Sequence, residues 1–140
     1  MTIREQNLET IAPVLATFTI SQTGGIDDLT DDSIGSAVAL TGSYEVGPAG
    51  DGAQVLGKLI SLSLSDADTG KRVATVQIGG ICSLPVAPAY PLVGNRVVGA
   101  AGGAVRQAPA LAGSDPAGGN IGRGTVLSIN GTTNCVLLLN

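Results

Sequence analysis

The sequence contains no histidine and no tryptophan, and its aromatic residues are Phe18, Tyr44 and Tyr90. Histidine is the side chain that most often titrates near neutral pH and binds metals, so its absence removes many catalytic and metal-binding arrangements. Charged residues make up 13% of the chain, against an ordinary fraction of roughly 25%. So little charge favours a surface that is covered by partners, the alternative being an ordinary glycine-rich β-domain.

Basic residues are few and scattered. There are seven lysines and arginines, of which Lys71 and Arg72 are adjacent, and the net charge is −4. Phosphate binding needs a basic stripe, and single-stranded nucleic acid also needs aromatic platforms, so direct nucleic-acid contact is not expected. No apolar run approaches the roughly 18 residues that a membrane span needs, and Met1–Glu9 lack the apolar core of a signal peptide. We therefore expect no membrane contact and synthesis in the cytoplasm.

The sequence predicts no catalytic centre and no cofactor. A nucleophile needs a nearby base, and Lys58 and Lys71 do not follow a Ser-x-x-Lys pattern. The serines of 61–65 alternate with leucine, which places their hydroxyls on one face of a strand. Gly99–Gly103 lack the Lys-Ser/Thr ending of a phosphate-binding loop. The protein is therefore predicted not to be an enzyme.

Two further features could hold a metal or a crosslink. The acidic run Asp27–Asp32 could be a cation site, but its spacing is not that of a calcium loop, which favours a solvated turn with aspartate caps. Cys82 and Cys135 form neither a metal-type pair nor a dense disulfide framework. We expect them to be small buried residues, the alternative being a disulfide in an oxidising compartment.

What the chain does contain is short apolar runs separated by its 21 glycines. Alternating apolar and polar residues between turn residues predict strands, and no segment keeps a helical period over ten residues. The expected class is therefore all-β. The predicted strands are Val14–Ile20, Ala37–Leu40, Tyr44–Val46, Val55–Leu64, Arg72–Ile78, Ile81–Val86, Arg96–Val98, Ala104–Arg106, Thr125–Ile129 and Cys135–Leu139.

The middle and the end of the chain are alike. The matched segments are 34–38 with 93–97, 57–62 with 124–129, and 76–78 with 136–138, at offsets of 59, 67 and 60 residues. Such matches in order predict a duplication with insertions in loops. Each unit, about 34–86 and 93–139, would be a small β-meander that cannot bury enough apolar area alone. We expect a small β-barrel or sandwich in which the two units share a core. Residues 1–20 would form an N-terminal arm and first strand, and 21–140 a single β-domain.

The segments Val55-Leu56-Gly57-Lys58 and Thr75–Pro85, which contains Val-Gln-Ile-Gly-Gly-Ile, resemble those of phage capsid decoration proteins, also called head cement proteins. The resemblance covers about residues 34–139 and rests on short glycine- and valine-based motifs. It implies a structural virion protein on the capsid exterior that clamps neighbouring capsomers. Its partners would be the major capsid protein and further copies of itself, in a homotrimer at three-fold positions. The family has no catalytic residues to transfer.

The first strand is the candidate for capsid contact, because an N-terminal segment can add to a neighbour's exposed sheet edge. The contact residues predicted on its apolar face are Ala12, Val14, Ala16, Phe18 and Ile20. Two other classes remain open. One is another virion β-protein, such as a tail or fibre component. The other is a carbohydrate-binding module, for which Tyr44 and Tyr90 would have to supply the aromatic platform.

Overall fold

The computed structural model describes residues 13–110 and 122–140. The described part is all-β, as predicted, with two single-turn 3-10 helices and no α-helix. Its strands are β1 Val14–Ile20, β2 Gln22–Thr23, β3 Ile26–Asp27, β4 Ala37–Gly42, β5 Glu45–Pro48, β6 Gly57–Leu62, β7 Val73–Pro85, β8 Val97–Gly99, β9 Val105–Gln107, β10 Thr125–Asn130 and β11 Asn134–Leu139. The 3-10 turns are η1 Asp31–Ser33 and η2 Ala101–Gly103.

Five strands close a small barrel in the order β1-β5-β4-β6-β7, with β7 returning to pair with β1. All neighbouring pairs are antiparallel except β1 and β5, which meet in parallel at Thr19 and Ile20. A closed barrel leaves no free sheet edge within the ring. We call these strands, with β7 taken to Ile78, the first unit.

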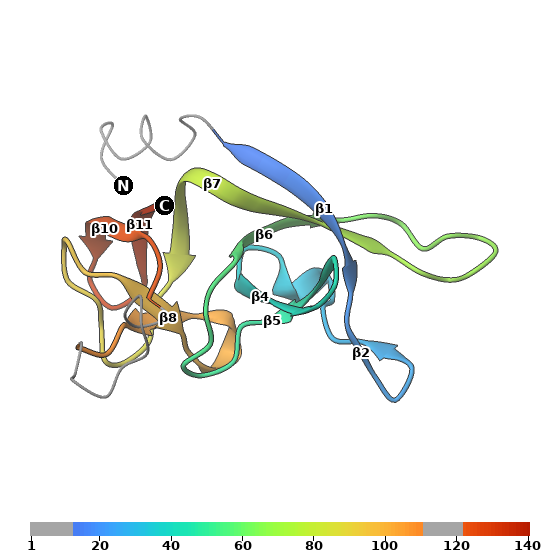
Figure 1. Cartoon of the computed structure of the whole chain (residues 1–140), viewed down its shortest axis with the longest axis horizontal. Helices are drawn as coiled ribbons and strands as arrows, with labels where there is room; N and C mark the ends of the chain where they lie inside the picture. The colour runs from blue at the N-terminus through green and yellow to red at the C-terminus, as the bar shows by residue number, and fades with distance from the viewer. Residues whose placement is uncertain (1–12, 111–121) are drawn as a thin grey trace.

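β7 is long because it serves two units. Its first half, up to Ile78, pairs with β1 and β6, and its second half, from Gly80, pairs with β11. Gly80 has φ 87°, which non-glycine residues rarely adopt, so the bend between the halves requires a glycine. The buried amide of Gln77 braces this bend by donating to the carbonyls of Gly79 and Ile81, each at 3.1 Å. Figure 1 shows β7 running from one side of the molecule to the other.

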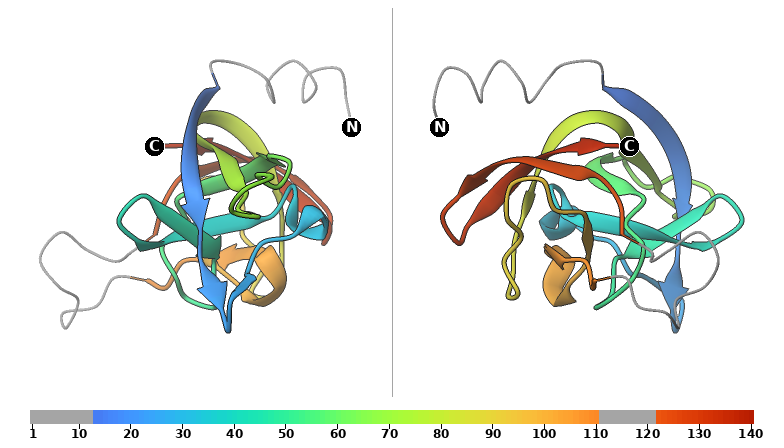
Figure 2. Two further views of the ribbon diagram at one scale, coloured as in Figure 1. Left: turned by 90° about the vertical axis from the view of Figure 1, so that its right-hand side faces the viewer. Right: turned by 60° about the vertical axis from the view of Figure 1, so that its left-hand side comes forward.

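The second unit, from Gly80 to the C-terminus, repeats the ring of the first. The second half of β7 pairs with β11, β11 with β10, and β8 with β9. Two isolated bridges join these pairs into a ring: Val97 with Arg123, and Val86 in parallel with Val105. The latter corresponds to the parallel contact of β1 with β5. In Figure 2 the β10–β11 hairpin (red) and β8 (orange) lie apart from β1 and β2 (blue).

Hydrogen bonds confirm the predicted duplication at the level of single residues. The backbone bonds in the first unit are Gly35 N to Leu59 O (2.8 Å), Leu59 N to Ser36 O (2.9 Å) and Leu56 N to Val38 O (2.8 Å). Their counterparts in the second unit are Gly94 N to Val126 O (2.8 Å), Val126 N to Asn95 O (3.0 Å) and Arg123 N to Val97 O (2.9 Å). The first two predicted offsets, 59 and 67, relate every one of these pairs.

The third predicted match was wrong by one residue. Leu59 pairs with Val76 in the first unit, and Val126 pairs with Leu137 in the second. Val76 therefore corresponds to Leu137 and not to Val136. A shift of one residue in a strand moves every side chain to the opposite face, and Val76 and Leu137 are both fully buried. The pattern Cys-Val-Leu-Leu-Leu is apolar on both faces, so the sequence alone could not fix its register.

The predicted boundary at residue 20 does not separate an arm from the repeat. Ala16 pairs with Val76, and Cys82 pairs with Leu137, so β1 is the counterpart of the second half of β7. β1 is thus the first strand of the first unit. The predicted first unit extended to Val86, so it wrongly included the second half of β7, which is the first strand of the second unit. Residues 1–12 of the expected arm lie outside the described part of the chain.

The apolar interior is divided between the units and is not the single shared core that we expected. The first-unit core contains Ile20, Leu29, Val38, Val46, Leu59, Ala74 and Val76. The second-unit core contains Cys82, Leu84, Val86, Val97, Val105, Val126, Cys135, Leu137 and Leu139, together with Ala37, Ala39, Ala49 and Val55 from the first unit. These four first-unit side chains join the two parts, because each is small enough for close packing between barrels.

Candidate functional site

The predicted contact residues of β1 lie largely on its inner face. Ile20 is buried and Phe18 packs against the first-unit core, while Ala16 is half-buried. Val14 is 53% exposed, and Ala12 lies outside the described residues. Alternation in the sequence separates two faces of a strand, and the more apolar face here turns toward the barrel's own interior. Capsid contact by β1 is therefore a hypothesis for Val14 and the outer face of the strand.

Exposed large apolar side chains lie mostly in loops and at strand ends. The most exposed are Leu64 (90%), Tyr44 (77%), Ile26 (72%), Val93 (65%), Leu92 (62%) and Leu40 (57%). Leu64 belongs to the loop between β6 and β7, which extends away from the first unit in Figure 1. Of these positions, sequence analysis singled out Tyr44 alone, as part of a possible aromatic platform. The signal available in the sequence was an apolar residue inside a turn segment, because the fold seldom buries a side chain at such a position.

Tyr44 combines exposure with an unusual backbone conformation. Its φ is 54°, and it is the one non-glycine residue with positive φ in the described part of the chain. A bulky residue in this region is uncommon and costs about 1–3 kcal/mol of strain. A glycine would relieve that strain, so the side chain is retained against a local energetic cost. Such positions cluster at functional sites.

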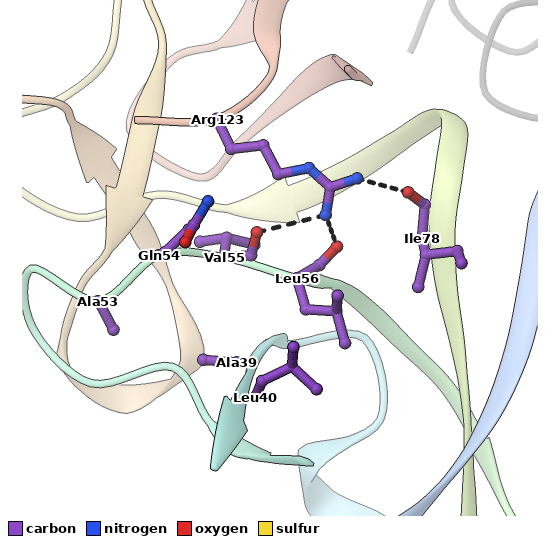
Figure 3. A pocket seen from close by; sticks show the side chains of 8 residues that line it. All are labelled: Ala39, Leu40, Ala53, Gln54, Val55, Leu56, Ile78 and Arg123. Carbon is purple, nitrogen blue, oxygen red and sulfur yellow. Dashed lines mark hydrogen bonds between the residues drawn. The ribbon is translucent and has the colours of Figure 1, made fainter. Parts of the chain in front are cut away.

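Arg123 lies between the two units. It belongs to the second unit, but its guanidinium donates to first-unit carbonyls: Val55 at 3.3 Å, Leu56, and Ile78 at 2.5 Å. Figure 3 shows the side chain directed between the segment carrying Val55 and Leu56 and the strand carrying Ile78. Burial lowers the pKa of Arg123 from its ordinary value, but three carbonyl acceptors compensate part of the lost hydration. Arg123 is thus a clamp that fixes the second unit to the first.

A hollow of about 430 Å³ adjoins this clamp. Besides Arg123 and the segment from Ala53 to Leu56, it is lined by Ala39, Leu40 and Ile78. The lining is mainly apolar and offers neither a nucleophile nor a carboxylate. The hollow therefore has the character of an apolar binding surface.

The acidic run lies partly in a turn, but the expected aspartate caps are not what caps it. Asp27 ends β3, and Asp31 and Asp32 begin η1, whose N-cap Thr30 and last residue Ser33 make a capping box. Ser21 donates to Asp28 at 2.7 Å, and Asp31 pairs with Arg72 at 2.7 Å. The Ser21 hydrogen bond holds the pKa of Asp28 below its ordinary value. Within residues 13–110 and 122–140, no three potential metal ligands lie together.

The two cysteines are buried thiols, as the prediction of small buried residues requires. Cys135 occupies the position that Ala74 occupies in the first unit. Burial raises the pKa of the Cys135 thiol to about 11, which keeps it neutral and unreactive at physiological pH.

Comparisons with family models, with curated proteins and with solved structures each gave no match. In the described ranges, no helix has the length and apolarity that crossing a membrane requires. The architecture of two fused barrels, the clamp and the exposed loop side chains are therefore the observations on which a function can be proposed.

Proposed function

We propose that this chain is a structural virion protein that binds the outer surface of an assembled phage capsid and clamps neighbouring capsomers. The observation that carries the proposal is the set of exposed apolar side chains at loops, above all Leu64, Leu92 and Val93, on a domain with few charges. Leu92 and Val93 are adjacent, whereas Leu64 lies in a different loop, and neighbouring exposed apolar groups are typical of surfaces that bind other proteins.

The duplicated architecture supports this function. A shell presents many copies of the same surface, and a chain with two similar units has a geometry suited to bridging neighbouring copies. The Arg123 clamp holds the units in one arrangement, so little conformational freedom is lost on binding. A protein that binds only the assembled shell stabilises that shell by mass action. Three chains joined as a trimer at a three-fold position would add avidity.

Binding to shells is the direct test. Shells assembled from the major capsid protein of the same virus are incubated with the chain, pelleted, and then melted with and without it. We expect co-sedimentation and a higher temperature of shell disassembly. Failure of both would contradict the proposal, and binding to a glucan array instead would favour a carbohydrate-binding module.

Loop variants locate the contact. The double variant Leu92→Ser and Val93→Ser, and separately Leu64→Ser, should weaken co-sedimentation while leaving the melting temperature of the free protein nearly unchanged. Ser65→Ala, in the same loop as Leu64, is the matched control and should bind like the wild type. Equal binding by all variants would move the contact to another face.

A further inference from the structure

A contact within the chain provides the starting point. The tip of the β8–β9 hairpin, residues 100–104, lies against the first unit, and its Gly102 and Gly103 line a hollow together with first-unit residues that include Ser36 and Pro48. A Cβ on Gly103 would lie 2.6 Å from the Cβ of Ser36, so the fit is close. Behind the tip, Gly99 exchanges backbone hydrogen bonds with the loop at residues 52 and 53, at 2.9 and 2.8 Å.

The first unit has the same hairpin, but its tip is exposed. The offset of 59 residues makes the β4–β5 tip, residues 41–45, the counterpart of residues 100–104. The β4–β5 and β8–β9 pairs keep the same register, with Val38 opposite Pro48 and Val97 opposite Gln107. Tyr44 corresponds to Gly103, and both have positive φ, 54° and 81°, although Gly102 also has positive φ and its counterpart Ser43 does not. Leu40 corresponds to Gly99. Tyr44 and Leu40 are 77% and 57% exposed.

The second unit has a smaller hollow that includes two of the equivalent positions. It has a volume of about 210 Å³ and is lined by Gly94, Asn95, Arg96, Gln107, Ala108 and Pro109. Asn95 is the counterpart of Ser36, and Gln107 that of Pro48. No residue of a hairpin tip lines this hollow among the described residues. Each chain thus presents an exposed tip whose counterpart contacts the first unit at Ser36, and a hollow lined by Asn95, the counterpart of Ser36.

Charge favours the same pairing. Residues 1–79 carry ten of the eleven carboxylates and four of the seven basic residues, a net charge of −6. Residues 80–140 carry one carboxylate and three arginines, a net charge of +2. The first unit of one chain is therefore attracted to the second unit of another, whereas like units repel.

We propose that a second copy of this chain docks head to tail, with the β4–β5 tip of one copy in the second-unit hollow of the next. The ring of Tyr44 would lie against the guanidinium of Arg96, a cation–π contact, and Leu40 would cover Ala108 and Pro109. The contact deepens the self-association included in the proposed function. It is formed by the free protein, so it stands or fails separately from shell binding. Because the interface is head to tail, it closes into a ring only if successive rotations complete a circle, as in a trimer.

Sedimentation velocity of the free protein tests this, with one variant on each side of the contact. Tyr44→Gly removes the ring and relieves the positive φ, and Arg96→Glu reverses the charge of the hollow. We expect the wild type to associate reversibly and each variant to lose association, with unchanged circular dichroism. Gln107→Glu is a milder hollow variant if Arg96→Glu unfolds the chain. Tyr90→Ser, at another exposed tyrosine, is the control and should associate like the wild type.

Mixing the two variants distinguishes this head-to-tail interface from a two-fold symmetric interface. The tip variant retains an intact hollow and the hollow variant an intact tip, so an equimolar mixture should form a complex of two chains. A wild type that remains monomeric up to about 1 mM, where millimolar affinity is detectable, would overturn the proposal. So would variants that associate as the wild type does, or a mixture that stays monomeric.

Discussion

The two units of this chain share their strand pairing but differ in their surfaces. Corresponding buried positions hold side chains of similar kind, such as Leu59 and Val126 or Val46 and Val105. Gly57 and Gly124 also correspond, and at both a Cβ would crowd a carbonyl of the partner strand, that of Gln77 or Leu138. The first unit carries most of the carboxylates, while residues 80–110 and 122–140 carry arginines and no carboxylate side chain.

The difference shows which positions define the barrel. Strand register depends on inward side chains and on a few glycines where backbones approach closely, and these positions agree between units. Surface positions tolerate change because they contribute little to stability. The outward differences can therefore carry function, with one unit acidic and the other basic. Four predictions test how far this equivalence of the units extends.

The largest expected effect comes from matched core truncations. Leu59→Ala should destabilise the protein by about 2–5 kcal/mol, as for other buried leucines, and Val126→Ala by less because fewer methyl groups are lost. Both side chains are fully buried, at 0% and 1% exposure. Denaturant unfolding followed by circular dichroism gives both values.

Calorimetry of the same variants asks whether the units unfold together. We expect one transition, because β7 belongs to both units and first-unit side chains fill part of the second-unit core. Two transitions, with each variant shifting a different one, would show that the units are independent domains.

The second prediction compares two arginines that join the units. Arg123→Met should cost about 1.5–3 kcal/mol, since carbonyls in a part-buried site lose a charged donor. Arg106→Met should cost less than about 1 kcal/mol, because its partner Asp51, at 2.9 Å, is 67% exposed. Urea unfolding measures both. Equal effects would mean that burial does not distinguish the two contacts.

Sequence analysis found the duplication but not its full extent. It recognised the Gly57 and Gly124 segments because a glycine at a close backbone approach is retained in both units. It missed the correspondence of β1 with the second half of β7, because Ala-Thr-Phe-Thr-Ile of 16–20 and Cys-Ser-Leu-Pro-Val of 82–86 share no identical residue. Only strand pairing reveals that these segments close equivalent rings.

The candidate site was less predictable than the fold. The clamp depends on where the long side chain of Arg123 ends, and the carbonyls it contacts lie 45 to 68 residues away in sequence. The exposure of Leu40 and Tyr44 likewise depends on which parts of the fold pack against the β4–β5 hairpin. Such tertiary relations leave no local pattern, whereas strands and glycine turns do.

The third prediction concerns alkaline pH and the second unit. The pKa of Cys135 is raised to about 11 by burial, so its contribution to stability is complete below the ordinary value of 9.0. It is lost as pH rises from there through about 11, because the unfolded chain ionises first. Cys135→Ala makes this position match Ala74 of the first unit. Denaturation midpoints between pH 8 and 11 should fall less steeply in the variant, and an unchanged slope would contradict the assignment.

The smallest effect is expected in the acidic run of the first unit. Replacing Asp27, Asp28, Asp31 and Asp32 with asparagine should change the melting temperature at pH 7 only slightly, because these side chains lie in a surface turn. The pKa of Asp28 is lowered, mainly by the Ser21 hydrogen bond and also by Thr23. Its contribution is therefore present above the ordinary value of 3.8 and is lost as pH falls below it. Melting curves from pH 7 down to 3 should accordingly show a shallower acid decline in the variant.

Asp66→Asn is the control for this acid dependence, since Asp66 lies in a different turn and its pKa is lowered by the backbone amides of Asp68 and Thr69. Asp66→Asn should reduce the fall in melting temperature at acid pH although the acidic run is unchanged.

Calcium gives a more direct test of whether the acidic run binds a metal. A solvated turn predicts the same melting temperature with and without calcium, because three of its carboxylates already have partners in Ser21, Gln22 and Arg72. If calcium raised the melting temperature of the wild type and not that of the four-residue variant, the acidic run would be a metal site. The two units would then differ in metal binding as well as in charge.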